Sequence, residues 1–151
     1  MNEGRTKAEF KALRESVGLA QIDVAEQLDI NIRTVKRWEN PNVPYMPIQA
    51  AWDMLDRAKR IQKAQIDHAR ETVENCIDTY GEAPHEVHIT YYRDQAMYDR
   101  FGRDEGPFGQ ANANARAVAY ELESWDITVR FDYPDEDNTA PEGMFTSRTR
   151  Q

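Results

Sequence analysis

The stretch Gly18-Leu-Ala-Gln-Ile-Asp-Val-Ala-Glu-Gln-Leu-Asp-Ile-Asn-Ile-Arg-Thr-Val-Lys-Arg-Trp-Glu39 decides how the first third of this chain folds. We expect two short helices in it, at residues 21–28 and 32–39, because apolar residues recur there at helical spacing. A tight turn at Asp29 joins the two helices. Asn31 is well placed to cap the second helix, since its side chain accepts a backbone N–H that the helix start leaves free.

The two helices are predicted to pack through small apolar stripes. The inward positions are Val24, Ala25 and Leu28 on the first helix and Val35 and Trp38 on the second. The second helix then turns Arg33, Thr34, Lys36 and Arg37 outward. A short helix with a cationic outer face is what the major groove of B-DNA admits. Alternatively, the three cations could form only a solvated helix face without a binding role, and this alternative stays open.

This pattern resembles the helix-turn-helix of the Xre family of bacterial and phage regulators. Gln21, Ala25, the helix start at Asn31 and the ending Trp38-Glu39-Asn40 fall in the family's register. The resemblance implies that Gln21 and Asn40 contact phosphates and that the start and outer face of the second helix reach base edges. The DNA-binding residues implied in this way are Gln21, Asn31, Ile32, Arg33, Thr34, Lys36, Arg37 and Asn40.

Two residues depart from the family pattern. Asp29 stands where the family usually has Gly, and Asp tolerates a left-handed backbone better than most residues. Ala20 replaces the usual Ser or Thr cap, which forgoes about 1 kcal/mol of capping. Gln21 and Asn40 could also serve only as helix caps. Glu39 is expected to be structural and to pair with a cation on the preceding helix, such as Arg14.

The acidic net charge of the chain is unevenly distributed. The whole chain carries −8 with a pI near 4.9. Residues 1–60 hold ten Lys and Arg against nine Asp and Glu, whereas residues 61–151 hold nine against eighteen. Residues 31–37 alone carry +3. Because local potential governs docking, an acidic chain of this kind still fits a small DNA-binding surface.

The flanks of the deciding stretch also predict helices. Thr6 and Glu9 form a capping-box pattern for a helix at residues 7–17. After three prolines in residues 41–47, a helix formed without Gly or Pro should run from Ile48 to about residue 79, with Pro47 in its first turn. Its inward stripe is Ile48, Trp52, Leu55, Lys59, Gln62, Ile66, Ala69, Val73 and Cys76. The polar middle suggests a solvent-bridging stalk, or a break between two helices near residues 59–65.

The second half predicts a small β-α-α-β unit. Strands are expected at residues 86–92 and 127–133 and helices at residues 95–101 and 110–124. The first strand should be half-buried, with Val87, Ile89 and Tyr91 on one face. A unit this small has open sheet edges and is marginal alone, so we expect it to dimerise. The candidate dimerisation residues are Val87, Ile89, Tyr91, Val118, Leu122, Ile127, Val129 and Phe131.

The whole layout is similar to that of the anti-CRISPR-associated repressors of phages. The shared features are the strand ending Tyr91-Tyr92-Arg93-Asp94, the short helix after it, and a second helix running into the last strand. This resemblance implies a homodimer that binds an inverted repeat in its own promoter.

Signals for other classes of protein are weak. His85 and His88 are three apart and lie near Cys76 in sequence, but they lack zinc-ligand spacing, so we expect no metal and no cofactor. We find no catalytic motif and expect no enzyme. No apolar run is long enough for a membrane span, and a lone cysteine suits the cytoplasm.

The fold class expected is therefore mainly α with a small α+β unit. Residues 1–58 would form a helix-turn-helix DNA-binding domain, residues 59–80 a connecting helix, residues 81–133 a dimerisation domain and residues 134–151 a disordered tail. The function expected is a homodimeric autorepressor that binds double-stranded DNA at a palindromic operator. The alternatives are an antitoxin that neutralises a toxin partner, a ligand-sensing regulator with a site at Tyr91 and Tyr92, and an RNA-binding protein.

Overall fold

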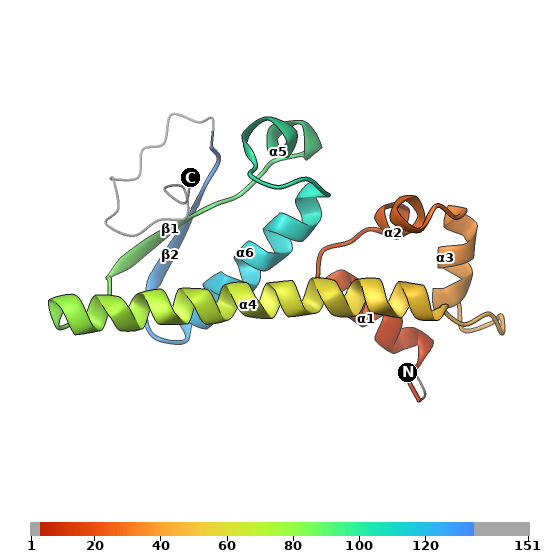
Figure 1. Cartoon of the computed structure of the whole chain (residues 1–151), viewed down its shortest axis with the longest axis horizontal. Helices are drawn as coiled ribbons and strands as arrows, with labels where there is room; N and C mark the ends of the chain where they lie inside the picture. Colours follow the sequence, from red (N-terminus) through yellow and green to blue (C-terminus); the bar gives the residue numbers. More distant parts are fainter. Residues whose placement is uncertain (1–3, 135–151) are drawn as a thin grey trace. The chain divides into compact units, whose positions relative to one another are not determined.

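The computed structural model describes residues 4–134 and is mainly helical, with one small parallel sheet (Figure 1). Its elements are α1 (Lys7–Ser16), α2 (Gln21–Leu28), α3 (Ile32–Glu39), α4 (Gln49–Tyr80), β1 (Glu86–Thr90), α5 (Gln95–Phe101), α6 (Phe108–Glu123) and β2 (Thr128–Asp132). The chain divides into two compact units after Gln62. The tail expected to be disordered lies, from residue 135 on, outside the described residues.

Side-chain caps explain where the first helices begin. The Thr6 hydroxyl accepts from the Glu9 N–H at 3.0 Å, and the Glu9 carboxylate accepts from the Thr6 N–H at 2.7 Å. The Asn31 side chain accepts from the Arg33 N–H at 2.8 Å and so caps α3. Both predicted caps are confirmed. They satisfy N–H groups that have no partner inside the helix.

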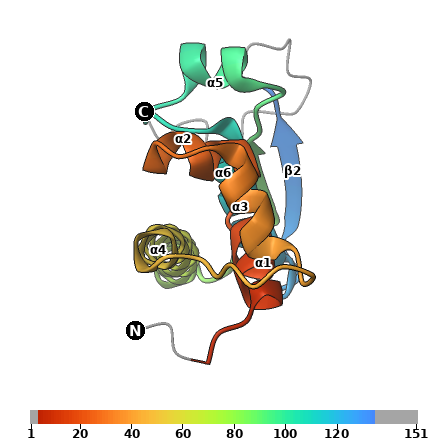
Figure 2. The same cartoon turned by 90° about the vertical axis from the view of Figure 1, so that its right-hand side faces the viewer.

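The two unusual residues noted in the sequence, Ala20 and Asp29, lie at the two ends of α2. Ala20 offers no side-chain cap, but the Asp23 carboxylate accepts from the Ala20 N–H at 2.7 Å. Asp29 ends α2 in the left-handed conformation, with φ 56° and ψ 50°. The Ile30 N–H then donates back to the Ala25 carbonyl at 2.9 Å. Figure 2 shows α2 and α3, both orange, following each other through this short turn.

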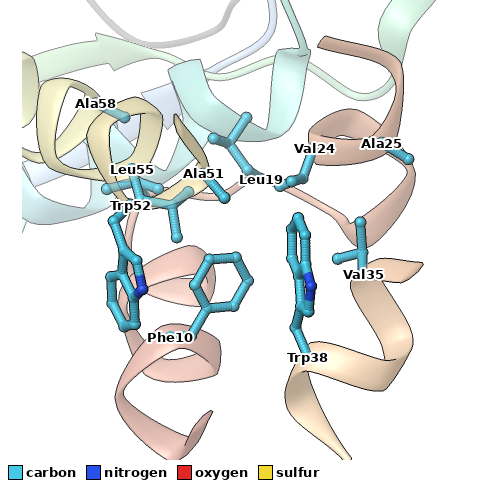
Figure 3. Packing of buried hydrophobic residues seen from close by; sticks show 11 residues of the cluster. Phe10, Leu19, Val24, Ala25, Val35, Trp38, Ala51, Trp52, Leu55 and Ala58 are labelled. Carbon is cyan, nitrogen blue, oxygen red and sulfur yellow. The ribbon is translucent and has the colours of Figure 1, made fainter. Parts of the chain in front are cut away.

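An aromatic stack forms the core of the first unit. The Phe10 ring lies between Trp38 and Trp52, with ring centroids 5.7 and 5.2 Å apart and edge-to-face geometry at both contacts (Figure 3). The other buried members are Val17, Leu19, Val24, Ala25, Val35, Ala51, Leu55 and Ala58. The predicted inward positions Val24, Ala25, Val35 and Trp38 are confirmed. Leu28 is partly buried against the same core.

The long helix α4 is continuous, without the break that the sequence left open. Pro47 precedes it and Ile48 is 48 % exposed, so neither takes the place expected for it inside the helix. The polar middle is also not a bare stalk. Gln62 is 3 % exposed and donates to the Ser16 carbonyl at 2.8 Å, while Lys59 Nζ reaches Gln62 Oε1 at 3.0 Å. The Gln62 side chain thereby satisfies a carbonyl at the end of α1, where carbonyls lack helical partners.

The second unit is built on two parallel strands that lie side by side in Figure 1. Their register places Val87 beside Val129 and Ile89 beside Phe131. The core of this unit is Val73, Val87, Ile89, Ala115, Ala119, Leu122 and Ile127, so it takes residues from α4, α6 and the sheet. The expected β-α-α-β order is confirmed. Both strands are shorter than expected, and α6 begins two residues earlier, at Phe108.

The expectation that β1 is half-buried is wrong, because its polar face is buried too. His88 is 1 % and Thr90 is 5 % exposed. The two ring nitrogens of His88 lie 2.8 Å from Asp132 Oδ2 and 2.7 Å from Glu86 Oε2. Hydrogen bonds on both sides of the ring offset the free-energy cost of burying a polar group.

Within residues 4–134, no helix is both long and apolar enough to cross a membrane.

Candidate nucleic-acid interface

Helix α3 carries the three cations on one face. Arg33, Lys36 and Arg37 are all exposed, and their spacing of three and four residues makes them neighbours on the helix surface. The opposite side of α3 is held in the core by Val35 and Trp38, which are 0 % and 3 % exposed. The packing of the helix therefore sets which face meets solvent, and that face is basic.

The positive charge of this face is not neutralised by nearby carboxylates. Across residues 4–134, no Asp or Glu lies within ion-pair distance of Arg33, Lys36 or Arg37. The Arg37 guanidinium lies beside an aromatic ring, with 5.9 Å between it and the centroid of the Tyr45 ring. Three clustered cations without counter-charges attract an anionic partner, because their field is not cancelled locally.

A buried network fixes the C-terminal end of α3. Arg14 of α1 donates to both carboxylate oxygens of Glu39, from Nε at 2.6 Å and from Nη2 at 2.9 Å. The predicted pairing of Glu39 with Arg14 is confirmed. Arg14 also donates to the Leu19 carbonyl at 2.9 Å, and Gln21 Nε2 donates to Glu39 Oε1 at 3.0 Å. One carboxylate thus joins α1, α2 and α3.

Lys7 provides a second attachment that the sequence did not reveal. Its Nζ donates to the carbonyls of Arg37 and Trp38, at 2.9 and 3.2 Å, and to that of Tyr45. These carbonyls belong to the end of α3 and to the loop after it. A cation at a helix C-terminus is favourable because carbonyl groups there carry partial negative charge. Lys7 therefore holds the Tyr45 loop beside the basic face.

The remaining predicted contact residues occupy mixed positions. Asn31 is exposed at the start of α3, while Ile32 and Thr34 are half-buried, and Ile32 packs against the core. Asn40 is exposed, and its Oδ1 accepts from the Asn42 N–H at 2.9 Å. Gln21 is half-buried and bonded to Glu39. Seven of the eight residues therefore lie on α3 or at its two caps, and the eighth, Gln21 of α2, is bonded to Glu39 at the C-terminal end of α3.

The candidate dimerisation residues divide into two groups. Val87, Ile89, Leu122 and Ile127 are at most 5 % exposed and form the core of their own unit. Tyr91, Val118 and Val129 are half-buried, and Phe131 is 44 % exposed. Only this second group offers side-chain surface to another molecule.

His85, His88 and Cys76 are the three residues considered for a metal site. His85 is exposed, with Nε2 3.5 Å from Glu82, whereas His88 is buried between Glu86 and Asp132. The Cys76 thiol donates to the Glu82 carbonyl at 3.5 Å. In the part of the chain that the structure describes, no three His, Cys, Asp or Glu side chains converge on a metal position.

The first unit thus holds a short basic helix in place through buried contacts. The second unit contains a small sheet with one partly exposed strand. No known protein-family model matches this chain, and no curated protein is similar to it in sequence.

Proposed function

We propose that this protein is a sequence-specific DNA-binding regulator that acts as a homodimer and represses its own operon from an inverted repeat. The observation that carries the proposal is the uncompensated basic face of α3, formed by Arg33, Lys36 and Arg37 on a helix held by a buried ion pair. In this proposal α2 and α3 form a helix-turn-helix, with α3 as the recognition helix.

The chemistry of these side chains suits duplex DNA. Arg forms two parallel hydrogen bonds to the O6 and N7 atoms of guanine in the major groove, which makes it the commonest base-specific contact. Lys36 lies between the two arginines in sequence and adds a phosphate or base contact. The N-terminus of α3 carries partial positive charge from its aligned peptide groups, which favours phosphate oxygens there. Gln21, which is bonded to Glu39, and Asn40, which follows Glu39, both lie at the C-terminal end of α3 and are proposed to contact phosphates there.

The buried contacts that hold α3 in place favour sequence-specific binding over non-specific electrostatic binding to DNA. Because Glu39 is bonded by both Arg14 and Gln21, α3 enters the groove without first losing conformational freedom. The charge distribution points the same way. Residues 61–151 carry eighteen acidic against nine basic residues, so they repel the DNA backbone and suppress non-specific binding.

A homodimer follows from the size of the reading head. One helix of eight residues contacts only a few base pairs, and two heads related by a two-fold axis read a palindrome. The half-sites are then separated by about 34 Å, one helical turn, or by a multiple of it. Repression of its own operon is the simplest regulatory outcome, because bound protein occupies the promoter.

The acidity of the second half favours one further candidate, an antitoxin. The acidic composition of residues 61–151 suits a basic toxin, and the same basic helix would repress the shared operon. The discriminating observation is a basic protein that co-purifies in fixed ratio when the surrounding operon is expressed.

The test is selection of bound sequences from a random duplex DNA pool with the purified full chain. We expect one palindrome with fixed half-site spacing. The double variant Arg33→Ala/Arg37→Ala should recover nothing above background. Its matched control is Arg57→Ala/Arg60→Ala, which removes the same charge from exposed positions of α4. If the wild type recovers no motif, or if both double variants lose it equally, the proposal is overturned.

A further inference from the structure

The two strands of the small sheet differ in how their outer edges are covered. In β1, Val87, His88, Ile89 and Thr90 are all buried. Just beyond β1, the Asn112 side chain accepts from the Tyr92 N–H at 2.9 Å and donates to the Tyr92 carbonyl at 2.7 Å, as a neighbouring strand would. In β2, by contrast, Thr128, Arg130 and Phe131 are exposed, and within residues 4–134 only β1 pairs with it.

The hydrogen bonds of the ladder show which backbone groups of β2 face outward. The Thr128 N–H donates to the His85 carbonyl at 3.1 Å, and the Asp132 carbonyl accepts from the Tyr91 N–H at 2.9 Å. The backbone N–H and C=O groups of residues 128, 130 and 132 therefore point toward β1, because these groups alternate in direction along a strand. The N–H and C=O groups of Val129 and Phe131 point the other way, toward the edge that no other strand within residues 4–134 covers.

We propose that a second copy of this chain adds its β2 to this edge as an antiparallel strand, with the two-fold axis at Phe131. Phe131 then faces the partner's Phe131 and exchanges two backbone hydrogen bonds with it. Val129 faces the partner's Tyr133 in the next hydrogen-bonded pair. The result is a continuous four-stranded sheet, which is more stable than two separate two-stranded ones.

Charge selects this register from its neighbours. With the axis at Phe131, each Arg130 faces the partner's Asp132 in a close, non-hydrogen-bonded pair. The cross-strand attraction then adds to the contacts that Arg130 makes with Glu86 and Asp132 makes with His88 within each chain. An axis at Arg130 places two arginines opposite each other, and an axis at Asp132 places two aspartates opposite each other. An axis at Val129 sets Asp132 against the partner's Asp126. Each of these three other registers is penalised by like charges, so among the four registers only the one with its axis at Phe131 pairs opposite charges.

The apolar face of the sheet supports the same partner. Phe131 is 44 % exposed, and its ring meets the Tyr91 ring with centroids 5.2 Å apart. Across the proposed axis this pair meets the same pair from the second copy, which buries four aromatic rings in one row. The inference deepens the dimeric part of the proposed function and rests on it, but not on DNA binding.

The test uses single cysteines in the full chain, after Cys76→Ser removes the natural thiol. In Phe131→Cys the two Cα atoms would lie about 5.5 Å apart, within disulfide range. The matched control is Thr128→Cys, also exposed on β2, whose copies would lie about 20 Å apart along the strands. Under mild oxidation we expect a covalent dimer from Phe131→Cys and none from Thr128→Cys.

A second variant keeps the test independent of the folding of the cysteine variants. Arg130→Glu should weaken self-association by about tenfold or more in sedimentation, because it places two Glu–Asp pairs across the axis. Circular dichroism checks that its fold is kept. A wild-type dimer that is unaffected by Arg130→Glu, or that cross-links equally at both cysteine positions, overturns the register.

The remaining outcomes are also decisive. A monomeric wild type overturns both this inference and the dimeric part of the proposed function, whereas DNA binding is scored separately by the selection. Cross-linking of Phe131→Cys only after removal of residues 135–151 overturns the inference as well, since the chain's own end would then cover the edge. A stable dimer with no cross-link at Phe131 places the interface elsewhere while leaving the proposed function intact.

Discussion

Arg14 and Glu39 form a two-pronged ion pair, with N···O distances of 2.6 and 2.9 Å and side chains that are only 9 % and 5 % exposed. The two residues are 25 positions apart and join the first and third helices. Gln21 donates to the same carboxylate, so the contacts that orient the basic helix α3 also hold the three helices together.

Removal of the Glu39 carboxylate should destabilise the protein strongly. We expect Glu39→Ala to lower the free energy of unfolding by about 3–5 kcal/mol, because Arg14 is left buried without its counter-charge. Urea unfolding measures this loss. Glu15→Ala is the control, since the Lys11–Glu15 pair is more than half exposed, is screened by solvent, and should contribute little to the free energy of unfolding. Equal losses in the two variants would contradict the interpretation of the buried pair.

The basic face should provide the specificity of DNA binding. Once a bound sequence is known, Arg33→Ala and Arg37→Ala should each cost about 1–3 kcal/mol of specific binding free energy if they reach base edges. Fluorescence anisotropy at fixed salt measures the effect. Arg60→Ala, an equal change of charge on α4, should cost less than either. Unchanged affinity in both α3 variants would remove the assigned reading face.

A larger side chain at Ala25 should disturb the crossing of α2 and α3. Ala25 is 2 % exposed in the core between these helices, so Ala25→Leu has no room to enter. We expect a loss of about 1–3 kcal/mol in stability from overpacking. Gln27→Leu adds a similar side chain at an exposed position of the same helix and should be nearly neutral. A thermal melt of both variants decides whether close packing at Ala25 matters.

Acid should weaken the first unit through Asp56. Arg5 donates to both oxygens of this carboxylate at 3.0 Å, and that hydrogen bonding holds the pKa of Asp56 below its usual value of 3.8. A lowered folded-state pKa gives stability above pH ~4 that is lost as the pH falls through the folded value. The melting temperatures of wild type and Asp56→Asn should therefore differ most above pH ~4 and converge at lower pH. A constant difference would contradict this coupling.

His88 should stabilise the second unit. His88→Leu leaves the Asp132 and Glu86 carboxylates without the ring that each now contacts, and we expect a loss of about 3 kcal/mol or more. His85→Leu is the control, because the His85 side chain is 78 % exposed. Near-neutral behaviour of His88→Leu would show that the carboxylates are adequately solvated without the ring.

Local chemistry explains which elements could be predicted from the sequence. Thr6, Asn31 and Asp29 act within two to four residues of where they stand, so the helix ends that they define are readable from the chain alone. Val35 and Trp38 face inward for the same reason, because helical spacing fixes their phase. The basic outer face of α3 then follows without any knowledge of the rest of the protein.

Contacts between distant residues explain what could not be predicted. Lys7 reaches carbonyls 30 to 38 residues away, and Gln62 reaches Ser16 across 46 residues. Neither contact leaves a periodic trace in the sequence. The burial of both faces of β1 was missed because His88 pairs with Asp132 on another strand, so its polarity suggested solvent. Strand direction was equally open, since alternation does not distinguish parallel from antiparallel pairing.

The positions of the three tryptophans give this chain built-in optical reporters. Trp38 and Trp52 lie in the aromatic stack of the first unit, at 3 % and 1 % exposure, while Trp125 is half-buried in the second unit. Emission from the first pair therefore reports one core, and emission from the third reports the other. Replacement of Trp125 by Phe, or of Trp38 and Trp52 by Phe, separates the two signals. A single fluorescence titration then shows whether the two cores melt as one cooperative system or in succession.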